Sequence, residues 1–313
     1  MTSSSSRARG FVADRVLAIF GPTASGKSAV AEAVAERIPA ELVSADAMQV
    51  YRGLPLLTNQ PDYPTRLVSI WRLHHEASVG EYQRLAHAAI DEILAAERTP
   101  VVVGGTGLYL RAALSRIELP PPPSPGVRAR FERLYDRLGP ERAHLALAER
   151  DSDAAARIHP NDRRRVVRAL ELADEGLSLV PARDMLWADA TRHPTIVFGL
   201  DVPREELERR IETRTRAMFE RGAAEEAQRA LAQPISTTAL HVLGLREAAE
   251  LPRDEAITQI ARRTRRYAAY QRKWMRRIPG LVSLPAGRPP AEIADEIVEM
   301  ARARQRLSAR RAG

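Results

Sequence analysis

One short segment constrains the fold of this chain more than any other. Residues 21–28 read GPTASGKS, which is the G-x-x-x-x-G-K-[ST] spacing of a phosphate-binding loop. The apolar run RVLAIF at residues 15–20 precedes the loop and is typical of a buried strand. A segment with helical spacing follows from Ser28 onward. Strand, glycine-rich turn and helix in this order aim backbone amides and a helix N-terminus at an anion, so we expect the loop to bind phosphate.

The loop predicts a set of ligands for a diphosphate or a longer phosphate chain. We expect Lys27 to neutralise phosphate charge and Ser28 to help hold Mg²⁺, the cofactor that the motif predicts. The chain contains only two lysines, Lys27 and Lys273, and otherwise uses arginine for positive charge. The ammonium of a lysine at position 27 is a compact point charge, and the planar guanidinium of an arginine does not replace it. The predicted diphosphate-binding residues are Gly21, Pro22, Thr23, Ala24, Ser25, Gly26, Lys27 and Ser28.

Strands and helices alternate on both sides of a helical stretch. Predicted strands lie at residues 41–44, 100–103, 195–200 and 281–284, and a predicted helix lies at residues 81–97. This alternation predicts an α/β fold with a doubly wound parallel sheet. A proline-rich segment at residues 119–126 interrupts it, and helices are predicted at 127–138, 140–149, 152–158 and 162–175. We therefore predict an α/β core of residues 15–115 and 191–313, an all-helical insertion of residues 116–190, and a disordered tail of residues 1–14.

Composition excludes several classes of protein. The chain has no cysteine, which excludes disulfides, thiolate catalysis and cysteine-ligated zinc and fits a cytoplasmic location. It has no apolar run long enough to span a membrane and no secretory signal at its start. The net charge of +8 favours an anionic partner such as nucleic acid, although a solvated arginine-rich surface explains the charge equally well.

Two polar segments follow predicted strands and face the same edge of the sheet as the phosphate loop. Asp46 comes directly after the strand at residues 41–44 and is either a general base or a carboxylate that caps a turn. Thr106 lies in the GGTG segment after the strand at residues 100–103, where glycines allow close approach of a backbone and the threonine offers a hydroxyl.

Arginine-rich helices are candidates for contacts with a phosphate backbone. Arg164 and Arg168 are four residues apart in the predicted helix 162–175, and Arg165 and Arg168 are three apart, so both pairs share a helical face. Residues 262–277, RRTRRYAAYQRKWMRR, carry eight basic residues and no acidic one. We expect Tyr267, Tyr270 and Trp274 to pack inward there, with the arginines facing out.

Taken together, these segments resemble one family, tRNA dimethylallyltransferase of the bacterial type, over about residues 15–278. The segments that carry the resemblance are GPTASGKS, SADAMQVYRG, PVVVGGTGLY, RIHPNDRRRVVRALE, the stretch from Arg210 to Met218, LGLRE and RRYAAYQRKW. The resemblance implies a nucleoside-triphosphatase-like core with a helical insertion. It also implies transfer of a dimethylallyl group from dimethylallyl diphosphate to N6 of the adenine at tRNA position 37, with the anticodon stem-loop gripped between core and insertion and the adenine flipped out.

The resemblance also implies roles for individual residues. Asp46 would be the base on the adenine amine, Thr106 would organise the reaction centre, and Arg214 would neutralise the leaving diphosphate with Lys27 and Ser28. The residues implied in tRNA binding are Asp46, Ala47, Met48, Gln49, Thr106, Arg128, Arg164, Arg165, Arg168, His241, Gly244 and Arg246. The sequence departs from the family pattern at Ala47, Gln60 and Leu245, and none of these departures removes the expected base or the phosphate loop.

Two other activities remain open on the sequence. An adenylate isopentenyltransferase, which prenylates free AMP, ADP or ATP, shares the phosphate loop and the aspartate but does not need the arginine-rich helices. An ATP-dependent small-molecule kinase explains the phosphate loop alone. A non-catalytic RNA-binding module is disfavoured because Lys27, Ser28, Asp46 and Thr106 are all present. We expect a monomer, with no membrane partner, that binds a tRNA anticodon stem-loop and dimethylallyl diphosphate.

Overall fold

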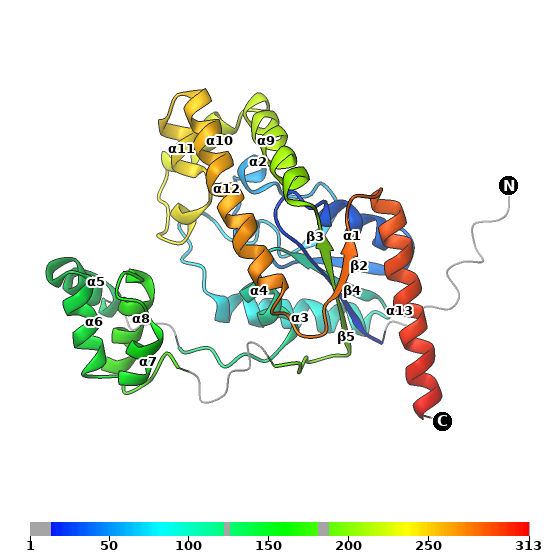
Figure 1. The fold of residues 1–313 in the computed structure, drawn as a ribbon, viewed down its shortest axis with the longest axis horizontal. Coiled ribbons are helices and arrows are strands. Elements are labelled where there is room, and N and C mark those ends of the chain that lie inside the picture. The colour runs from blue at the N-terminus through cyan, green and yellow to red at the C-terminus, as the bar shows by residue number, and fades with distance from the viewer. Residues whose placement is uncertain (1–13, 122–125, 181–187, 313) are drawn as a thin grey trace. The chain divides into compact units, whose positions relative to one another are not determined.

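The computed structural model describes residues 14–121, 126–180 and 188–312 (Figure 1). Its centre is a six-stranded sheet in the order β3-β2-β4-β1-β5-β6, with every neighbouring pair parallel. The predicted α/β class with a doubly wound parallel sheet is therefore confirmed. The strands are β1 (Val16–Phe20), β2 (Ala40–Ser44), β3 (Thr65–Arg66), β4 (Thr99–Gly104), β5 (Thr195–Asp201) and β6 (Val282–Pro285).

Helices surround this sheet and form a separate bundle in the middle of the chain. The helices that belong with the sheet are α1 (Lys27–Ala35), α2 (Pro55–Thr58), α3 (Val79–Ala95), α4 (Gly107–Leu114), α9 (Arg204–Glu220), α10 (Ala223–Leu231), η2 (Ala239–His241), α11 (Leu245–Glu250), α12 (Arg253–Met275) and α13 (Pro290–Ala312). The bundle consists of α5 (Val127–Leu138), α6 (Pro140–Ala148), α7 (Ser152–Arg157) and α8 (Arg163–Asp174).

The chain divides into two compact units. One comprises residues up to 116 together with residues from 186 onward, and the other comprises residues 117–185. The sequence predicted an insertion over residues 116–190. The predicted tail at residues 1–14 lies outside the described residues except for Asp14, whose carboxylate pairs with Arg15 at 2.7 Å. Residues 122–125 of the predicted proline-rich linker are also outside them.

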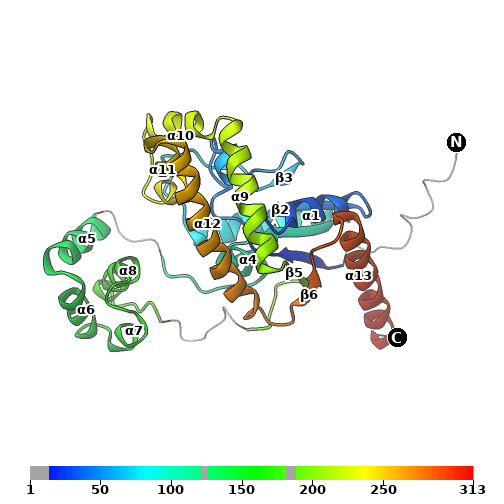
Figure 2. The same cartoon turned by 45° about the horizontal axis from the view of Figure 1, so that its top comes forward.

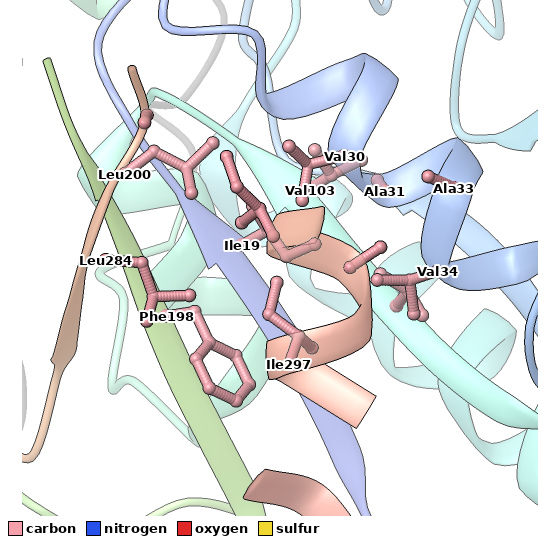
Figure 3. Packing of buried hydrophobic residues seen from close by; sticks show 14 of the residues in the cluster. Ile19, Val30, Ala31, Ala33, Val34, Val103, Phe198, Leu200, Leu284 and Ile297 are labelled. Atoms are coloured by element: carbon pink, nitrogen blue, oxygen red, sulfur yellow. The ribbon is translucent and has the colours of Figure 1, made fainter. Parts of the chain in front are cut away.

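The sheet forms because its central strands are apolar on both faces, as expected for strands covered by helices on both sides. Every residue of β1 and of β4 is buried. On one face, Ile19, Val103 and Phe198 from three strands pack with Val34 of α1 and Ile297 of α13 (Figure 3). Figure 2 shows α13, from the end of the chain, beside α1, from its beginning. This core fixes the positions of the strands, and the site described below lies at their ends.

Element boundaries differ from the predicted ones by small shifts with local causes. Helix α3 begins at Val79 instead of residue 81, because the Ser78 hydroxyl accepts a hydrogen bond from the Glu81 amide at 3.1 Å and caps the helix. The short elements α2 and β3 were not predicted, since four and two residues are too few to show a hydrophobic period. The four predicted helices of the bundle are all present.

The bundle has its own apolar core, so it folds around contacts that do not involve the sheet. Phe131, Tyr135, Leu147, Val166 and Leu170 are among its buried residues. No helix in the described part of the chain is long and apolar enough to cross a membrane.

Candidate active site

Three loops meet at one edge of the sheet. The phosphate loop follows β1, Asp46 follows β2, and Thr106 follows β4. Strand β4 lies between β1 and β2, and all three are parallel, so their carboxyl ends are adjacent. Ligands of open α/β sheets bind at this edge. The structure thus brings together the three segments that the sequence predicted to face one crevice.

The phosphate loop has the backbone conformation that a tight anion-binding turn requires. Ala24 and Gly26 adopt positive φ angles of 64° and 87°, and helix α1 begins at Lys27 directly after them. A Cβ on Gly21 would lie 2.6 Å from the Ser25 hydroxyl, so this position accepts only glycine without rearrangement. The loop therefore leads its backbone into the N-terminus of α1, where the helix dipole favours an anion.

Two cations and one carboxylate share the site. Burial lowers the pKa of the Lys27 ammonium to about 8, the Asp46 carboxylate opposes that shift, and the Arg214 guanidinium adds to it. Burial also lowers the pKa of Arg214, with Asp46 again opposing. One guanidinium nitrogen of Arg214 donates to the Thr23 hydroxyl at 2.9 Å. Two half-buried cations beside one carboxylate leave an excess of positive charge, which suits a multiply charged anion.

Thr106 is hydrogen bonded to the loop that carries Asp46. Its hydroxyl accepts from the Ala47 amide at 3.2 Å and lies 3.2 Å from the Tyr267 hydroxyl. The Asp46 carboxylate accepts from the Met48 amide at 2.9 Å. Burial raises the pKa of Tyr267 well above its ordinary value, so its hydroxyl stays protonated. The Thr106 hydroxyl is thus bonded to the Asp46 loop, and the Asp46 carboxylate is held by an amide of its own loop.

Asp46 lines two neighbouring cavities. The first is lined by Lys27, Ser28 and Glu32 of α1 together with Asp46 and Gln49. The second is lined by both polar and apolar side chains. It is lined by Thr23, Asp46, Met48, Leu57, Thr58, Ile211, Arg214, Thr215, Met218, Leu243, Ile260, Thr264, Tyr267 and Gln271. Asp46 thus borders a polar cavity that holds Lys27 and a second cavity that holds Arg214 and several apolar side chains, so it can serve a ligand that has both an anionic and an apolar part.

The oxygen donors beside Lys27 fit a magnesium ion. Ser28, Glu32 and Asp46 all line the first cavity, and Mg²⁺ takes oxygen ligands together with waters and substrate phosphates. The described residues contain no cluster of three or more His, Asp or Glu that forms a complete metal cage. The donor set therefore fits an ion that is held jointly with a phosphate ligand.

The predicted tRNA-binding residues fall into three groups. Asp46, Ala47, Met48, Gln49 and Thr106 lie at the sheet edge described above. His241 and Arg246 are exposed and flank Gly244, whose φ of 89° begins α11. The remaining four, Arg128, Arg164, Arg165 and Arg168, lie in the helical bundle.

Within the bundle these four arginines differ in their surroundings. Arg128 and Arg168 both pair with the buried carboxylate of Glu171, at 3.0 Å and 2.9 Å. Arg164 and Arg165 are exposed. The two pairs therefore differ: Arg128 and Arg168 neutralise a buried carboxylate, and Arg164 and Arg165 face solvent.

One prediction about α12 is wrong. Tyr270 does not pack inward but is 54% exposed, whereas Tyr267 and Trp274 are partly buried. Tyr270 lies one helical turn from the exposed Arg266 and so shares its face.

Two arginines of α9 also differ in their contacts. Arg210 pairs with Glu206 of its own helix at 2.7 Å, while Arg214, one turn later, reaches the phosphate loop.

Several residues of the site were not singled out from the sequence. The apolar walls come from Ile211, Met218, Leu243 and Ile260, and the buried amide of Gln271 contacts two of the loops. Their elements are far apart along the chain, and apolar residues at helical spacing do not distinguish a cavity wall from a core.

Comparison with known proteins identifies the family of this site. The sequence model of the IPP transferase family matches residues 49–278, and that of the isopentenyl transferase family matches residues 14–74. The chain belongs to the IPP transferase family. The segments in the family match include Thr106, Arg214 and all of α12, and the second match includes the phosphate loop and Asp46.

Relatives of this IPP transferase cover most of its length. The chain is 40% identical to the tRNA dimethylallyltransferase of Salinispora arenicola over 285 residues, which is 87% of this chain and 82% of that protein. It is 39% identical to the tRNA dimethylallyltransferase of Streptomyces coelicolor, over 88% of this chain and 91% of that protein.

Solved structures share the fold. The tRNA isopentenylpyrophosphate transferase of Bacillus halodurans superposes with a TM-score of 0.68 at 30% identity, covering 95% of this chain and 99% of that one. A eukaryotic dimethylallyltransferase acting on tRNA superposes with a TM-score of 0.72 at 25% identity, covering 87% of this chain and 74% of that one. The nucleoside-triphosphatase-like core that the sequence predicted is therefore confirmed.

Proposed function

We propose that this IPP transferase transfers a dimethylallyl group from dimethylallyl diphosphate to N6 of the adenine at tRNA position 37, giving N6-isopentenyladenosine. The observation that carries the proposal is the position of Asp46, which lines both the polar cavity that holds Lys27 and the partly apolar cavity that holds Arg214. Family membership supports the same reaction, because relatives over most of the chain are tRNA dimethylallyltransferases.

In the proposed reaction, the phosphate loop and its cations hold the leaving group. Lys27 and Arg214 neutralise the diphosphate of the donor, and the backbone of residues 21–28 cradles it. The allylic chain lies against the apolar wall that includes Ile211 and Met218. As the bond between the allylic carbon and the diphosphate oxygen breaks, negative charge grows on the diphosphate, where fixed cations stabilise it.

Asp46 is the proposed base. The adenine N6 forms a bond to the allylic carbon, the carbon–oxygen bond to diphosphate breaks, and the amine proton passes to the Asp46 carboxylate. Thr106, whose hydroxyl accepts from the Ala47 amide, holds the Asp46 loop in place. Magnesium bound by Ser28 and diphosphate oxygens would supply further neutralisation of the leaving group.

The alternative activities explain less of the molecule. An adenylate isopentenyltransferase would use the same cavities but has no role for the exposed Arg164 and Arg165 of the bundle. A small-molecule kinase accounts for the phosphate loop and not for the apolar wall beside Arg214. The exposed cations and the apolar wall together favour an RNA acceptor and a prenyl donor.

A transfer assay tests the proposal. Radiolabelled dimethylallyl diphosphate and Mg²⁺ are incubated with the protein and with either an anticodon stem-loop carrying adenine at position 37 or free AMP. Label in the RNA and not in AMP is the expected result. Label in AMP alone would favour the adenylate enzyme, and hydrolysis of ATP without label in either acceptor would favour the kinase.

A variant separates the enzyme from a binding module. Asp46→Ala removes the proposed base, so we expect loss of about 100-fold or more in the transfer rate, as for other general bases. Binding of the stem-loop should be retained and weakened far less than the transfer rate, because Asp46 is only one of the residues implied in tRNA binding. Transfer at the original rate by this variant would show that Asp46 is not the base.

A further inference from the structure

A buried amide connects the phosphate loop to the loop that carries Thr106. Gln271 lies on α12 and is 1% exposed. Its side-chain oxygen accepts from the Thr23 amide at 2.8 Å, and its side-chain nitrogen donates to the Gly105 carbonyl at 2.9 Å. One side chain thus spans two loops that follow different strands, β1 and β4.

The chemistry of the two partners determines which way the amide faces. The Thr23 amide is only a donor, so it must face the Gln271 oxygen. The Gly105 carbonyl is only an acceptor, so it must face the Gln271 nitrogen. A flipped amide would place donor against donor and acceptor against acceptor. The two backbone partners therefore allow only one orientation of the Gln271 amide.

Helix α12 also occupies the space where the second loop would carry side chains. A Cβ on Gly105 would lie 2.2 Å from the Gln271 nitrogen, and one on Gly107 would lie 2.1 Å from the indole ring of Trp274. Both glycines have ordinary φ angles, so close approach of α12, and not backbone conformation, requires glycine there. The loop around Thr106 therefore rests directly on α12.

The same part of α12 reaches two further groups of the site. Tyr267, one turn before Gln271, places its hydroxyl 3.2 Å from that of Thr106. Thr23 accepts through its own hydroxyl from Arg214 of α9, a helix that packs beside α12 (Figure 1). The phosphate loop is thus held from α9 and from α12, and α12 contacts the Thr106 loop at two points.

We propose that Gln271 is a positioning residue that sets the distance between the diphosphate of the donor and the acceptor amine. This inference rests on the proposed function, since it takes the phosphate loop to hold the donor and the Asp46–Thr106 pair to hold the acceptor. Transfer needs the allylic carbon and the amine within near-attack distance, and a displacement of about 1 Å can cost about 100-fold in rate. An amide that is hydrogen bonded at both its oxygen and its nitrogen keeps the two loops at a fixed separation.

Three variants test this role. Gln271→Met has a similar length but removes both hydrogen bonds. Gln271→Glu keeps the acceptor for Thr23 but, when ionised, sets a carboxylate against the Gly105 carbonyl. The matched control is Gln228→Glu, the same substitution at an exposed position of α10 whose amide makes only a 3.5 Å contact.

For Gln271→Met we expect the single-turnover rate of transfer to fall by about 10- to 100-fold. Affinity for inorganic pyrophosphate should fall by about tenfold or less, since the amides and cations of the loop remain. Affinity for the stem-loop should stay close to that of the unmodified protein, whereas the melting temperature should fall by a few degrees, because the Thr23 amide and the Gly105 carbonyl lose this partner. Gln228→Glu should leave all four quantities unchanged.

The pH profile of Gln271→Glu distinguishes positioning from packing. A protonated carboxyl group donates through its hydroxyl to Gly105 and accepts from Thr23, as the amide does. Burial raises the pKa of such a carboxyl, so protonation becomes accessible as the pH falls toward about 6. We expect the rate of this variant, divided by that of the unmodified protein, to rise about fivefold or more between about pH 8 and about pH 6.

Two results would overturn the inference. A single-turnover rate for Gln271→Met within twofold of the original would show that the bonds do not set the geometry. The inference would also fail if the rate of Gln271→Glu, divided by that of the unmodified protein, did not change with pH, and if Gln271→Met and Gln271→Glu differed from the unmodified protein only in thermal stability. If the unmodified protein binds pyrophosphate but transfers no prenyl group to RNA, the proposed function fails instead, and the pyrophosphate affinity of Gln271→Met then tests the link to the phosphate loop by itself.

Discussion

Arg214 donates to the hydroxyl of Thr23 at 2.9 Å, although the two residues are 191 positions apart in the sequence. Helix α9 thereby places a half-buried guanidinium against the phosphate loop from outside the β1–α1 unit. The loop thus has cations on two sides, Lys27 from its own helix and Arg214 from a distant one. This arrangement is what an anion with several charged oxygens requires.

Removal of Arg214 should weaken donor binding. We expect Arg214→Ala to raise the dissociation constant for dimethylallyl diphosphate by about 10- to 100-fold, because a hydrogen bond to a charged group contributes about 1.5–3 kcal/mol. Isothermal titration calorimetry measures the constant.

Thr23→Val is the matched change at the other end of the same contact. It removes the hydroxyl but leaves the guanidinium, so its effect should be smaller than that of Arg214→Ala. Equal affinities for Arg214→Ala and the unmodified protein would mean that this guanidinium does not contact the donor.

Donor binding should depend on pH through Lys27. Burial lowers its pKa from 10.5 to about 8, so in the free protein the side chain loses its charge as the pH rises through about 8. A diphosphate needs the charged form, and we therefore expect affinity to fall as the pH increases from about 8 to about 9.5. Titration calorimetry over this range gives the slope, and Lys27→Met should abolish it.

The same group affects stability with the opposite sign. Between about pH 8 and 10.5 the unfolded chain binds more protons at Lys27 than the folded one does. The contribution of Lys27 to the free energy of unfolding of the ligand-free protein should therefore increase as the pH rises through this window. Urea unfolding of the unmodified protein and of Lys27→Met should differ in pH dependence there, and parallel curves would contradict the assignment.

Gly104 should not tolerate a side chain. A Cβ at this position, the end of β4, would lie 2.1 Å from the carbonyl oxygen of Ala45 in the neighbouring loop. We expect Gly104→Ala to lower the free energy of unfolding by about 1–3 kcal/mol and to displace the Asp46 loop, with loss of activity. Gly80→Ala, in α3 with no atom within 4 Å of the new Cβ, should stabilise by up to about 1 kcal/mol.

Arg164 and Arg168 should respond differently to substitution. Arg164 is exposed, so Arg164→Ala should weaken stem-loop binding and reduce the salt dependence of affinity by about one ion, with little change in stability. Arg168 pairs with the buried Glu171, so Arg168→Ala should lower the free energy of unfolding, by up to about 3–5 kcal/mol. Filter binding at several salt concentrations and urea unfolding separate the two effects. Identical behaviour of the variants would contradict this division.

Much of the fold follows from local patterns in the sequence. Strands β1 and β4 are short apolar runs beside glycine-rich turns, and both were predicted within two residues of their observed ends. The phosphate loop was predicted from its spacing together with the flanking strand and helix, because all of these features lie within a few residues of one another in the chain. Short elements without a hydrophobic period, such as α2 and β3, could not be predicted in this way.

The orientation of single residues on α12 was harder to predict from the sequence. Tyr267 and Tyr270 are three residues apart and of the same type, yet one is bonded to Thr106 and the other is exposed. Helical spacing says which residues share a face but not which face meets the core, and a helix with basic residues on most sides gives no clear apolar stripe.

The sequence by itself determined the chemistry available to this protein: a phosphate loop, a carboxylate after one strand and a threonine after another. It did so because each group is specified by neighbours a few residues away. Only the tertiary structure decided which distant groups join them. Arg214 and Gln271 reach the phosphate loop because α9 and α12 pack beside it. Their contacts with Thr23 join residues that are 191 and 248 positions apart, which no local pattern encodes.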